Sequence, residues 1–215
     1  MFKLNRLSKR MIILLAAVSA LGPVGMQILL PALPVIKQKF FVTNDVAQLT
    51  LSLSMLAIAI GTLVYGPLSD KFGRKRVMLV GIVITIFGSI VCFVADSIML
   101  LISGRFIQAF GGAVGLVLAR AIVRDVYGPE EAARVIATLV MVMVVLPMMS
   151  PALGGELMQR FGFESVFIVI AFASAIAFVF LFLWLPETLA KPVPFEGVKS
   201  MLMTFSKLFA SRIFC

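Results

Sequence analysis

The sequence contains no histidine and only two cysteines. Without histidine, the chain cannot build an imidazole metal site or a Ser-His or Cys-His nucleophilic pair, and it lacks the usual proton carrier near neutral pH. Cys92 lies in an apolar stretch and Cys215 is the last residue, so the two do not indicate a disulfide framework. We therefore expect no metal, no cofactor and no enzymatic activity.

Charged residues are also scarce. Of the 215 residues, 13% are charged and 61% are hydrophobic, whereas soluble domains are about 25% charged and about 45–50% apolar. One soluble globule could not bury that much apolar surface, so the surrounding solvent must be lipid. Each apolar stretch is near the ~20 residues that cross ~30 Å of hydrocarbon as a helix. The sequence predicts an all-α membrane protein with six transmembrane helices, at residues 11–33, 46–68, 77–95, 98–119, 133–154 and 165–185.

The first apolar stretch has one other interpretation. Basic residues precede it, and a Val-Ser-Ala sequence ends at Ala20, as in a cleaved signal peptide. Its apolarity continues to Leu33, however, and five more stretches follow, which favours a transmembrane helix.

Lysines and arginines alternate strongly between the two sides of the predicted membrane. If both termini are cytoplasmic, the cytoplasmic side holds fifteen of them and the outer side only Lys37, Lys39 and Arg160; Arg105 lies inside the fourth span. Cytoplasmic loops of membrane proteins are enriched in these residues. We therefore expect a multi-pass protein of the inner (cytoplasmic) membrane with both termini in the cytoplasm. This asymmetry also explains the net charge of +9 without a nucleic-acid partner.

The composition changes after the sixth span. Residues 1–185 are predicted to form the six-helix bundle, and residues 186–215 a cytoplasmic linker with an amphipathic helix. Apolar residues recur at helical spacing from Val198 onward, as in a helix on the membrane surface. The segment could equally be the approach to a seventh span that begins an absent second half.

An eight-residue pattern occurs twice. Residues 66–73 and 155–162 both fit Gly-x-Leu-x-x-Lys/Arg-Phe-Gly, and both follow the second span of a trio. Because three spans separate the copies, they fall on opposite membrane faces. The pattern thus predicts two inverted three-helix repeats, an arrangement typical of secondary transporters.

Several motifs resemble those of the major facilitator superfamily. The sequence GPLSDKFGRKRV at residues 66–77 is similar to the family's loop between spans 2 and 3. Arg105-Phe-Ile-Gln108, followed by Gly111 and Gly112, is similar to the span-4 motif, with Ala109 in place of its first glycine. Residues 147–155 resemble the span-5 motif of the drug:proton antiporters.

Three shorter motifs point to the bicyclomycin/chloramphenicol-resistance (Bcr/CflA-like) subfamily: Leu30–Pro34, Ala121–Asp125 and Leu185–Thr188. The resemblance implies the N-terminal half of a twelve-helix transporter that exports small amphiphilic drugs in exchange for protons by alternating access. Its partners would be the drug, protons, the bilayer, and a missing C-terminal half or a second copy. The alternative is a non-transporting half that acts as an interaction or regulatory membrane protein.

The resemblance also implies a cytoplasmic gate. Gly66 and Gly73 are expected to allow a sharp turn and a close approach of helices. Asp70 lies among basic residues, where anchoring of the loop alone would not need an acid, and Asp125 is the expected partner of Arg74. The alternative is that these charges only set the topology.

Four residues are candidate substrate or coupling contacts. Arg105 lies about seven residues, or roughly 10 Å, into its span, where an arginine is costly and usually faces a cavity; it could otherwise snorkel to the outer interface. Gln108 shares its helix face. Gln27 occupies the position of an aspartate in the subfamily's span-1 pattern, and glutamine cannot carry a proton. Any proton-carrying carboxylate is then expected to be Glu156, at the outer end of span 5, or to lie in the missing half.

The fifth span carries the expected helix-packing residues. Pro147 and Pro151 are expected to loosen the helix, and Gly154 and Gly155 to permit close packing. The methionines of this span have two interpretations, an adaptable wall for drugs or lipid-facing filler; they are Met141, Met143, Met148 and Met149.

Overall fold

In the computed structural model, which describes residues 8–189, every regular element is a helix. The elements are α1 (Lys9–Gln27), the 3-10 turn η1 (Leu30–Ala32), α2 (Leu33–Phe40), α3 (Asn44–Phe72), α4 (Arg74–Phe93), α5 (Ile98–Val126), α6 (Pro129–Phe161) and α7 (Ser165–Trp184). Six stretches are long and apolar enough to cross a membrane when residues 9–40 are counted as one. The prediction of an all-α protein with six spans is confirmed. The amphipathic helix expected after Val198 lies outside the described residues.

Helices α3, α5 and α6 extend beyond the apolar stretches 46–68, 98–119 and 133–154, because charged and polar residues outside the hydrocarbon can continue a helix. The first span differs in another way, since α1 ends at Gln27 and the chain continues through η1 and α2. Pro31 and Pro34 each occupy the first turn of one of these short helices. Proline fits a first turn but cannot donate the hydrogen bond that would continue a preceding helix. The predicted span 11–33 is therefore interrupted at its outer end.

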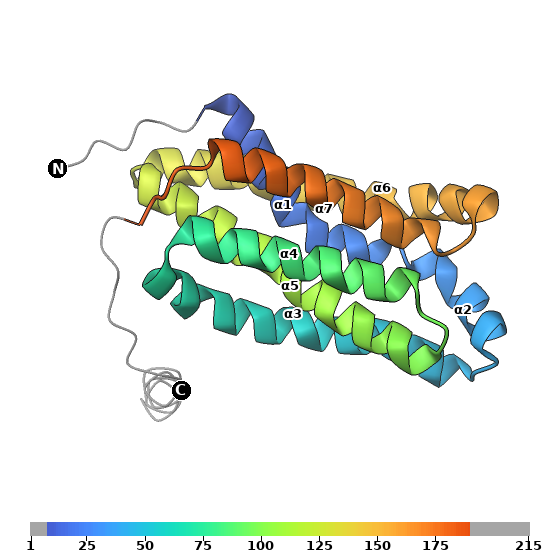
Figure 1. Ribbon diagram of the computed structural model, residues 1–215. Coiled ribbons are helices and arrows are strands. Elements are labelled where there is room, and N and C mark those ends of the chain that lie inside the picture. Colours follow the sequence, from blue (N-terminus) through green and yellow to red (C-terminus); the bar gives the residue numbers. More distant parts are fainter. Residues whose placement is uncertain (1–7, 190–215) are drawn as a thin grey trace, which may run out of the picture.

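The connections alternate between the two ends of the bundle (Figure 1). The start of α1, the α3–α4 and α5–α6 connections and the end of α7 lie together, on the left in Figure 1. The α2–α3, α4–α5 and α6–α7 connections lie at the opposite end. The bundle thus gathers at one end the connections for which the sequence predicts a cytoplasmic location.

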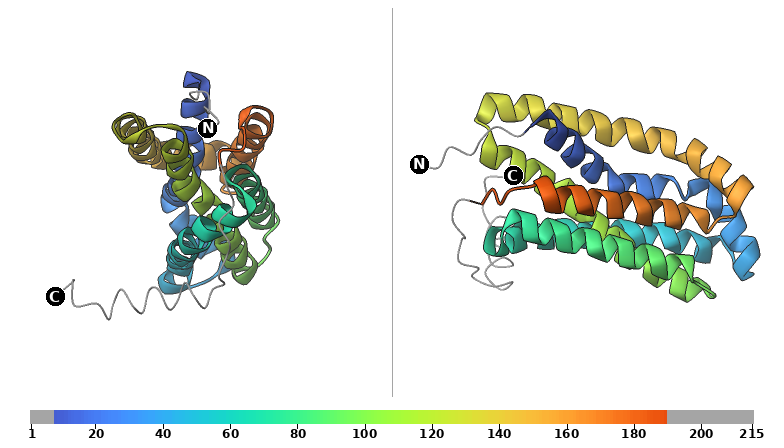
Figure 2. Two further views of the ribbon diagram at one scale, coloured as in Figure 1. Left: turned by 90° about the vertical axis from the view of Figure 1, so that its left-hand side faces the viewer. Right: turned by 45° about the horizontal axis from the view of Figure 1, so that its top comes forward.

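Helix α5 lies in the middle of the bundle and contacts α1, α3, α4 and α6 (Figure 2). Its glycines allow neighbouring backbones to touch. A Cβ atom at Gly111 would lie 2.5 Å from the backbone nitrogen of Thr85 on α4, and one at Gly115 would lie 2.2 Å from the carbonyl oxygen of Val18 on α1. Small residues at such crossings are how helices pack in lipid, where no hydrophobic force draws them together.

The two copies of the repeated pattern end their helices in the same way. Gly73, after α3, has φ +98° and Gly162, after α6, has φ +83°. The N–H of Gly73 donates to the carbonyl of Ser69, and that of Gly162 to the carbonyl of Met158, each at 3.0 Å. Glycine is favoured at such positive φ values. This shared geometry, at opposite ends of the bundle, agrees with the inverted repeat.

The expectation for Gly66 was wrong. Helix α3 runs through Gly66 to Phe72, and a Cβ atom at Gly66 would meet nothing within 4 Å. Gly66 therefore makes neither a sharp turn nor a close helix contact within the described residues. A glycine inside a helix costs only about 1 kcal/mol relative to alanine, so it does not stop a long apolar helix. The chain turns only at Gly73.

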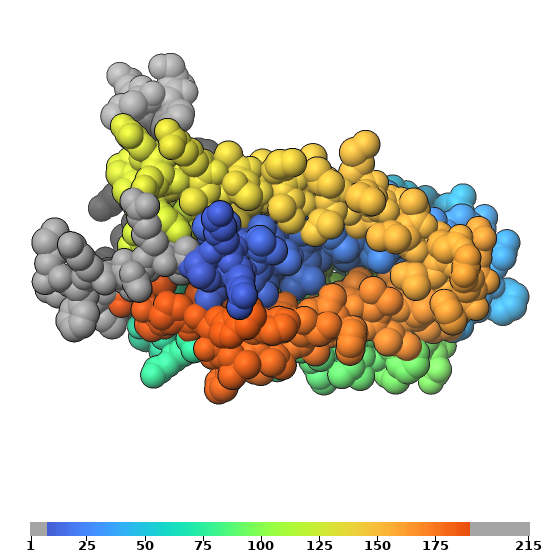
Figure 3. All heavy atoms as spheres, turned by 90° about the horizontal axis from the view of Figure 1, so that it is seen from above, coloured from blue at the N-terminus to red at the C-terminus, as the bar shows by residue number. Residues whose placement is uncertain are grey.

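Helix α6 contacts mainly α1, which lies between α6 and α7 (Figure 3). It continues through Pro147 and Pro151 without a break. A Cβ atom at Gly154 would lie 2.4 Å from the carbonyl oxygen of Ile28, so this glycine permits close packing as predicted. Gly155 meets nothing within 4 Å, and that prediction was wrong for this half. Adjacent residues point about 100° apart around a helix, so only one of the two glycines faces α1.

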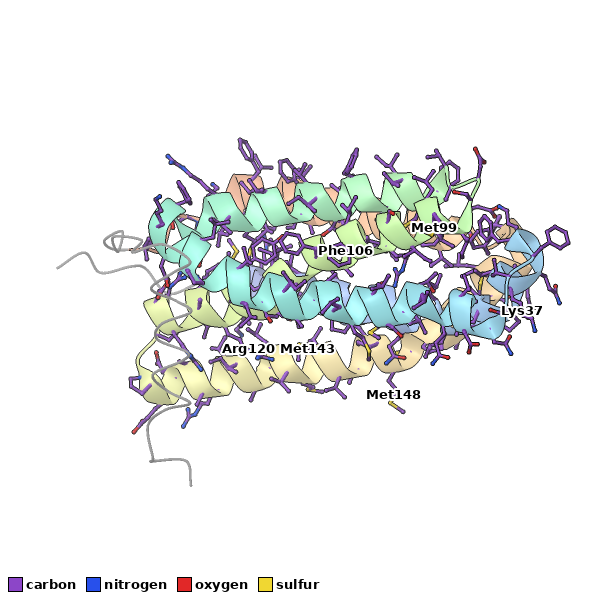
Figure 4. The ribbon with its side chains drawn as sticks, turned by 90° about the horizontal axis from the view of Figure 1, so that it is seen from below. Lys37, Met99, Phe106, Arg120, Met143 and Met148 are labelled. Atoms are coloured by element: carbon purple, nitrogen blue, oxygen red, sulfur yellow. The ribbon has the colours of Figure 1, made fainter. Side chains whose placement is uncertain are left out.

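The methionines of α6 lie mostly on the outside of the described bundle. Met141, Met148 and Met149 are exposed, and Met148 projects away from the helices (Figure 4). Met143 instead lies between α5 and α6, where its sulfur is 3.8 Å from a guanidinium nitrogen of Arg120. The exposed methionines can therefore meet only lipid or a partner surface that the described residues do not include.

An ion pair joins the two trios at the end of the bundle opposite to the α3–α4 connection. Lys39 at the end of α2 donates to the carboxylate of Glu164, which precedes α7, and its ammonium lies 4.5 Å from the ring centroid of Phe163. Partial burial raises the pKa of Glu164, but the hydrogen bond and charge of Lys39, with a backbone N–H, outweigh this and leave the pKa below its usual value.

Candidate functional site

Charged residues converge where α3 ends and α4 begins. The guanidinium of Arg74 lies 2.6 Å from the carboxylate of Asp70, one turn before it, and 3.0 Å from that of Asp125 near the end of α5. It also donates to the hydroxyl of Ser69. The structure thus brings together the predicted gate residues Asp70, Arg74 and Asp125. The contact between Arg74 on α4 and Asp125 on α5 joins the first trio of helices to the second at this end of the bundle.

Glu187, which follows α7, completes this group. Its carboxylate accepts from the backbone N–H of Arg74 at 2.8 Å and from that of Lys75 at 3.3 Å. A carboxylate at a helix N-terminus satisfies free N–H groups and interacts favourably with the helix dipole. A Cβ atom at Gly73 would lie 2.4 Å from this carboxylate, so Gly73 is needed for the turn and for the approach of Glu187. We call Asp70, Arg74, Asp125 and Glu187 the Arg74 cluster.

The role of Glu187 was not predicted from the sequence. Leu185–Thr188 was interpreted only as a subfamily motif, although an acid directly after the last apolar span is a signal of such a contact. The segment is held in place by other contacts as well, since Leu185 and Thr188 are buried and Lys75 donates to the carbonyl of Phe182 at 2.9 Å. The Arg74 cluster therefore connects α3, α4, α5 and the chain after α7 at one end of the bundle.

The second group of polar residues lies inside the bundle. Arg105 is only 2% exposed and its guanidinium donates to the side-chain oxygen of Gln108. The amide of Gln108 donates to the hydroxyl of Ser89 on α4 at 2.6 Å, and Ser89 donates to the carbonyl of Thr85 at 2.8 Å. The alternative in which Arg105 snorkels to the interface is wrong, because its side chain is buried and donates to Gln108, which in turn reaches α4.

A small cavity adjoins this chain of hydrogen bonds. Its volume is about 10 Å³, which is room for about one water molecule. Arg105 and Gln108 line it together with residues of α1, α3, α4 and α7. We call it the Arg105 cavity. A compound the size of a drug does not fit inside it, so within this conformation of the described residues the cavity accommodates at most a small group.

The other two candidates lie elsewhere. Gln27 is the last residue of α1 and is not among the residues that line the Arg105 cavity. Glu156 is exposed near the end of α6, where it accepts from Arg160 one turn later. Of the four predicted substrate or coupling residues, the structure brings together only Arg105 and Gln108. Within residues 8–189, no three His, Cys, Asp or Glu side chains lie close enough to hold a metal ion.

Known transporters are similar to this chain in sequence and in fold. The chain is 31% identical to the MFS-type transporter YdgK of Bacillus subtilis over 94% of this chain and 51% of that protein. It is also 31% identical to the bicyclomycin resistance protein homolog of Haemophilus influenzae over 82% of this chain and 44% of that one. The crystal structure of the human organic anion transporter MFSD10 superposes with a TM-score of 0.71 at 22% identity, over 86% of this chain and 50% of that one.

The chain thus spans about half the length of the curated relatives it matches. The family model of the Major Facilitator Superfamily matches residues 15–215, which is nearly the whole chain. The six apolar helices agree with this match, and the relatives are transporters rather than enzymes. The chain belongs to the Major Facilitator Superfamily.

Proposed function

We propose that this chain is the N-terminal half of a drug:proton antiporter of the inner membrane, which exports small amphiphilic compounds by alternating access. The observation that carries the proposal is the buried guanidinium of Arg105, which lies beside a cavity within a span. A charge at that depth costs at least ~2.5 kcal/mol and is usually retained for function. The similarity to a bicyclomycin resistance protein homolog supports export of drugs as the function.

Alternating access requires a closure at each end of the bundle. The Arg74 cluster is the proposed closure on the cytoplasmic side, since the mostly buried guanidinium of Arg74 and its acidic partners link several helix ends. The fifteen basic residues expected on that side support cytoplasmic termini. Several of them, including Lys75 and Arg76, are placed to bind anionic lipid headgroups. The second half of the transporter, or a second copy of this chain, would supply the opposing surface.

The proton carrier of the proposed exchange is Glu156 or an acid of the second half. Gln27 can donate and accept hydrogen bonds but cannot carry a proton. Nine acidic residues lie in the described chain, and none lies deep in a helix: they are Asp45, Asp70, Asp96, Asp125, Glu130, Glu131, Glu156, Glu164 and Glu187. A proton that crosses this half would therefore have to use the outer end of α6.

Drug resistance of cells tests the proposal. The complete transporter should be expressed in a bacterium that lacks its own exporters and challenged with neutral, acidic and cationic drugs, namely chloramphenicol and bicyclomycin, nalidixic acid, and ethidium. We expect the minimum inhibitory concentration of at least one compound to rise severalfold, and Arg105→Gln to abolish the rise.

Phe172→Leu serves as the matched control, because this side chain is 66% exposed on α7, and it should behave like the wild type. The alternative, a non-transporting half with a regulatory role, predicts unchanged susceptibility to every drug although the protein reaches the membrane.

A further inference from the structure

The ion pair at the end of the bundle opposite to the Arg74 cluster joins equivalent helix ends. Arg74 begins α4 and pairs with Asp125, the last residue but one of α5. Glu164 immediately precedes α7 and pairs with Lys39, the last residue but one of α2. Inverted repeats make span 1 equivalent to span 4 and span 3 equivalent to span 6. The two contacts therefore correspond to each other, with the acid and the base exchanged.

Both contacts connect the first trio of helices to the second, but they differ in their exposure to solvent. The guanidinium of Arg74 is mostly buried, whereas the side chains of Lys39 and Glu164 are 40% and 32% exposed. An ion pair that is accessible to solvent contributes little to the stability of a fold. The pair between Lys39 and Glu164 can therefore separate without unfolding the bundle.

Aromatic rings surround the base of this pair. The ring centroid of Phe163 lies 6.4 Å from that of Phe40 and 6.0 Å from that of Phe167, with both contacts edge to face. The ammonium of Lys39 lies 4.5 Å from the centroid of Phe163, where the face of a ring attracts a cation. Phe163 and Phe167 are buried. These rings give Lys39 one defined position to which it can return.

The short helix that carries Lys39 is separate from the rest of span 1. Helix α1 ends at Gln27, and the chain continues through η1 into α2, whose first turns contain prolines (Figure 1). After α2, Phe41 adopts a left-handed conformation with φ +52°, which is uncommon for a bulky residue. Hinges consist of a few residues at the ends of such elements, where backbone angles can change. Helix α2 can therefore move relative to α1.

We propose that Lys39 and Glu164 form a latch that must open and close during transport. When the latch is closed, the pair holds α2 against the start of α7; when it is open, α2 can pivot where it is separated from α1. Both partners belong to the same half of the transporter, so the latch acts within one half, whereas alternating access moves one half against the other. Lys39 and Glu164 are positioning residues that act through the place of α2. This inference rests on the proposed transport function and adds a moving element to it.

Exchange of the two charges tests whether the residues act on each other in the complete transporter. Lys39→Glu places two acids side by side, and Glu164→Lys two bases. Each should lower the export rate per molecule severalfold for a compound that the wild type exports. The double variant should restore the rate, because opposite charges are again adjacent. Lys37→Glu is the matched control: it makes the same charge change on α2, and no ion pair among residues 8–189 includes Lys37, so it should export like the wild type.

A reversible cross-link tests whether the latch has to open. Lys39→Cys and Glu164→Cys should be combined, and the two thiols joined by a bis-methanethiosulfonate reagent long enough to span the replaced side chains. Export should stop when the link forms and return to its earlier rate after reduction with dithiothreitol. Each single cysteine variant, treated in the same way, should keep the rate that it had before treatment. These controls also cover the native cysteines, of which Cys92 is buried.

Two results would overturn the inference. Unchanged export by the cross-linked protein would show that the contact between Lys39 and Glu164 is a fixed brace. A double charge exchange that exports no faster than the single variants would show that the two charges do not act on each other. Failure of the wild type to export any compound of the resistance panel would instead refute the proposed function, on which the latch rests.

Discussion

Replacing Gly111 by alanine should prevent most of the protein from accumulating in folded form. The new Cβ atom would lie 2.5 Å from the backbone nitrogen of Thr85 and 2.6 Å from the carbonyl oxygen of Gly81. Both are backbone atoms of α4, which cannot rotate away, so the two helices would have to separate along their length. Overpacked cores typically lose up to about 3 kcal/mol, and a loss of this size lowers Tm by about 6 °C or more in a chain of this length.

The matched control is Gly155→Ala. Gly155 also lies inside a long helix, but an added Cβ atom meets nothing there, and alanine favours the helix by up to about 1 kcal/mol. Size-exclusion chromatography of a fluorescent fusion and thermal unfolding in detergent measure both variants. Equal yields and equal Tm values for the two would show that α4 and α5 do not touch at Gly111.

Replacing Arg74 by alanine should nearly abolish transport while leaving the protein in the membrane. The change removes the ion pairs with Asp70 and Asp125 and the hydrogen bond to Ser69. A loss of about 1.4 kcal/mol from the closed state shifts the balance between the two access states by about tenfold. Arg74→Lys should give an intermediate rate, because an ammonium cannot span two carboxylates as a planar guanidinium does.

Arg76→Ala distinguishes a gate from a topology signal. Arg76 is exposed two residues later in the same connection, so its removal deletes the same charge without touching the Arg74 cluster. Initial rates of drug export, divided by the amount of transporter in the membrane, measure the effect. If both variants lower the amount of protein equally and leave the rate per molecule unchanged, the basic residues only set the topology.

Much of the fold could be predicted because it depends on local properties of the chain. The lengths of the apolar stretches predict the six helices, and the repeated pattern predicts that the two trios of helices are inverted relative to each other. The pattern could not show which of its glycines reverses the chain. Gly66 and Gly73 look alike in sequence, but only Gly73 adopts a positive φ, beside the carboxylate of Glu187. That carboxylate is 113 residues from Arg74, and no local pattern reports such a contact.

The candidate site was predictable for similar reasons and to a similar extent. An arginine in an apolar span needs hydrogen-bond partners, and Gln108, one turn later on the same helix, could be expected to be one of them. The hydroxyl of Ser89 on the next helix could not be expected, because its approach depends on how closely α4 and α5 pack. Gln27 was expected near the same site, but α1 ends at that residue. Where α1 ends and the chain continues into η1, the following side chains no longer point in the directions that a continuous helix would give them. An alignment of motifs does not show where that change occurs.

Transport by the purified complete protein under an imposed pH gradient tests the central claim most directly. The pH inside and outside the proteoliposomes should be set so that protons flow in the direction opposite to export. The compound whose minimum inhibitory concentration rises most in the resistance assay should then be followed over time. We predict that the compound moves uphill and that this movement stops when a protonophore collapses the gradient. In Glu156→Gln, the proton dependence of transport should either disappear or persist because an acid of the second half carries the proton. Transport that is indifferent to the gradient, or no transport by folded protein, would contradict the account.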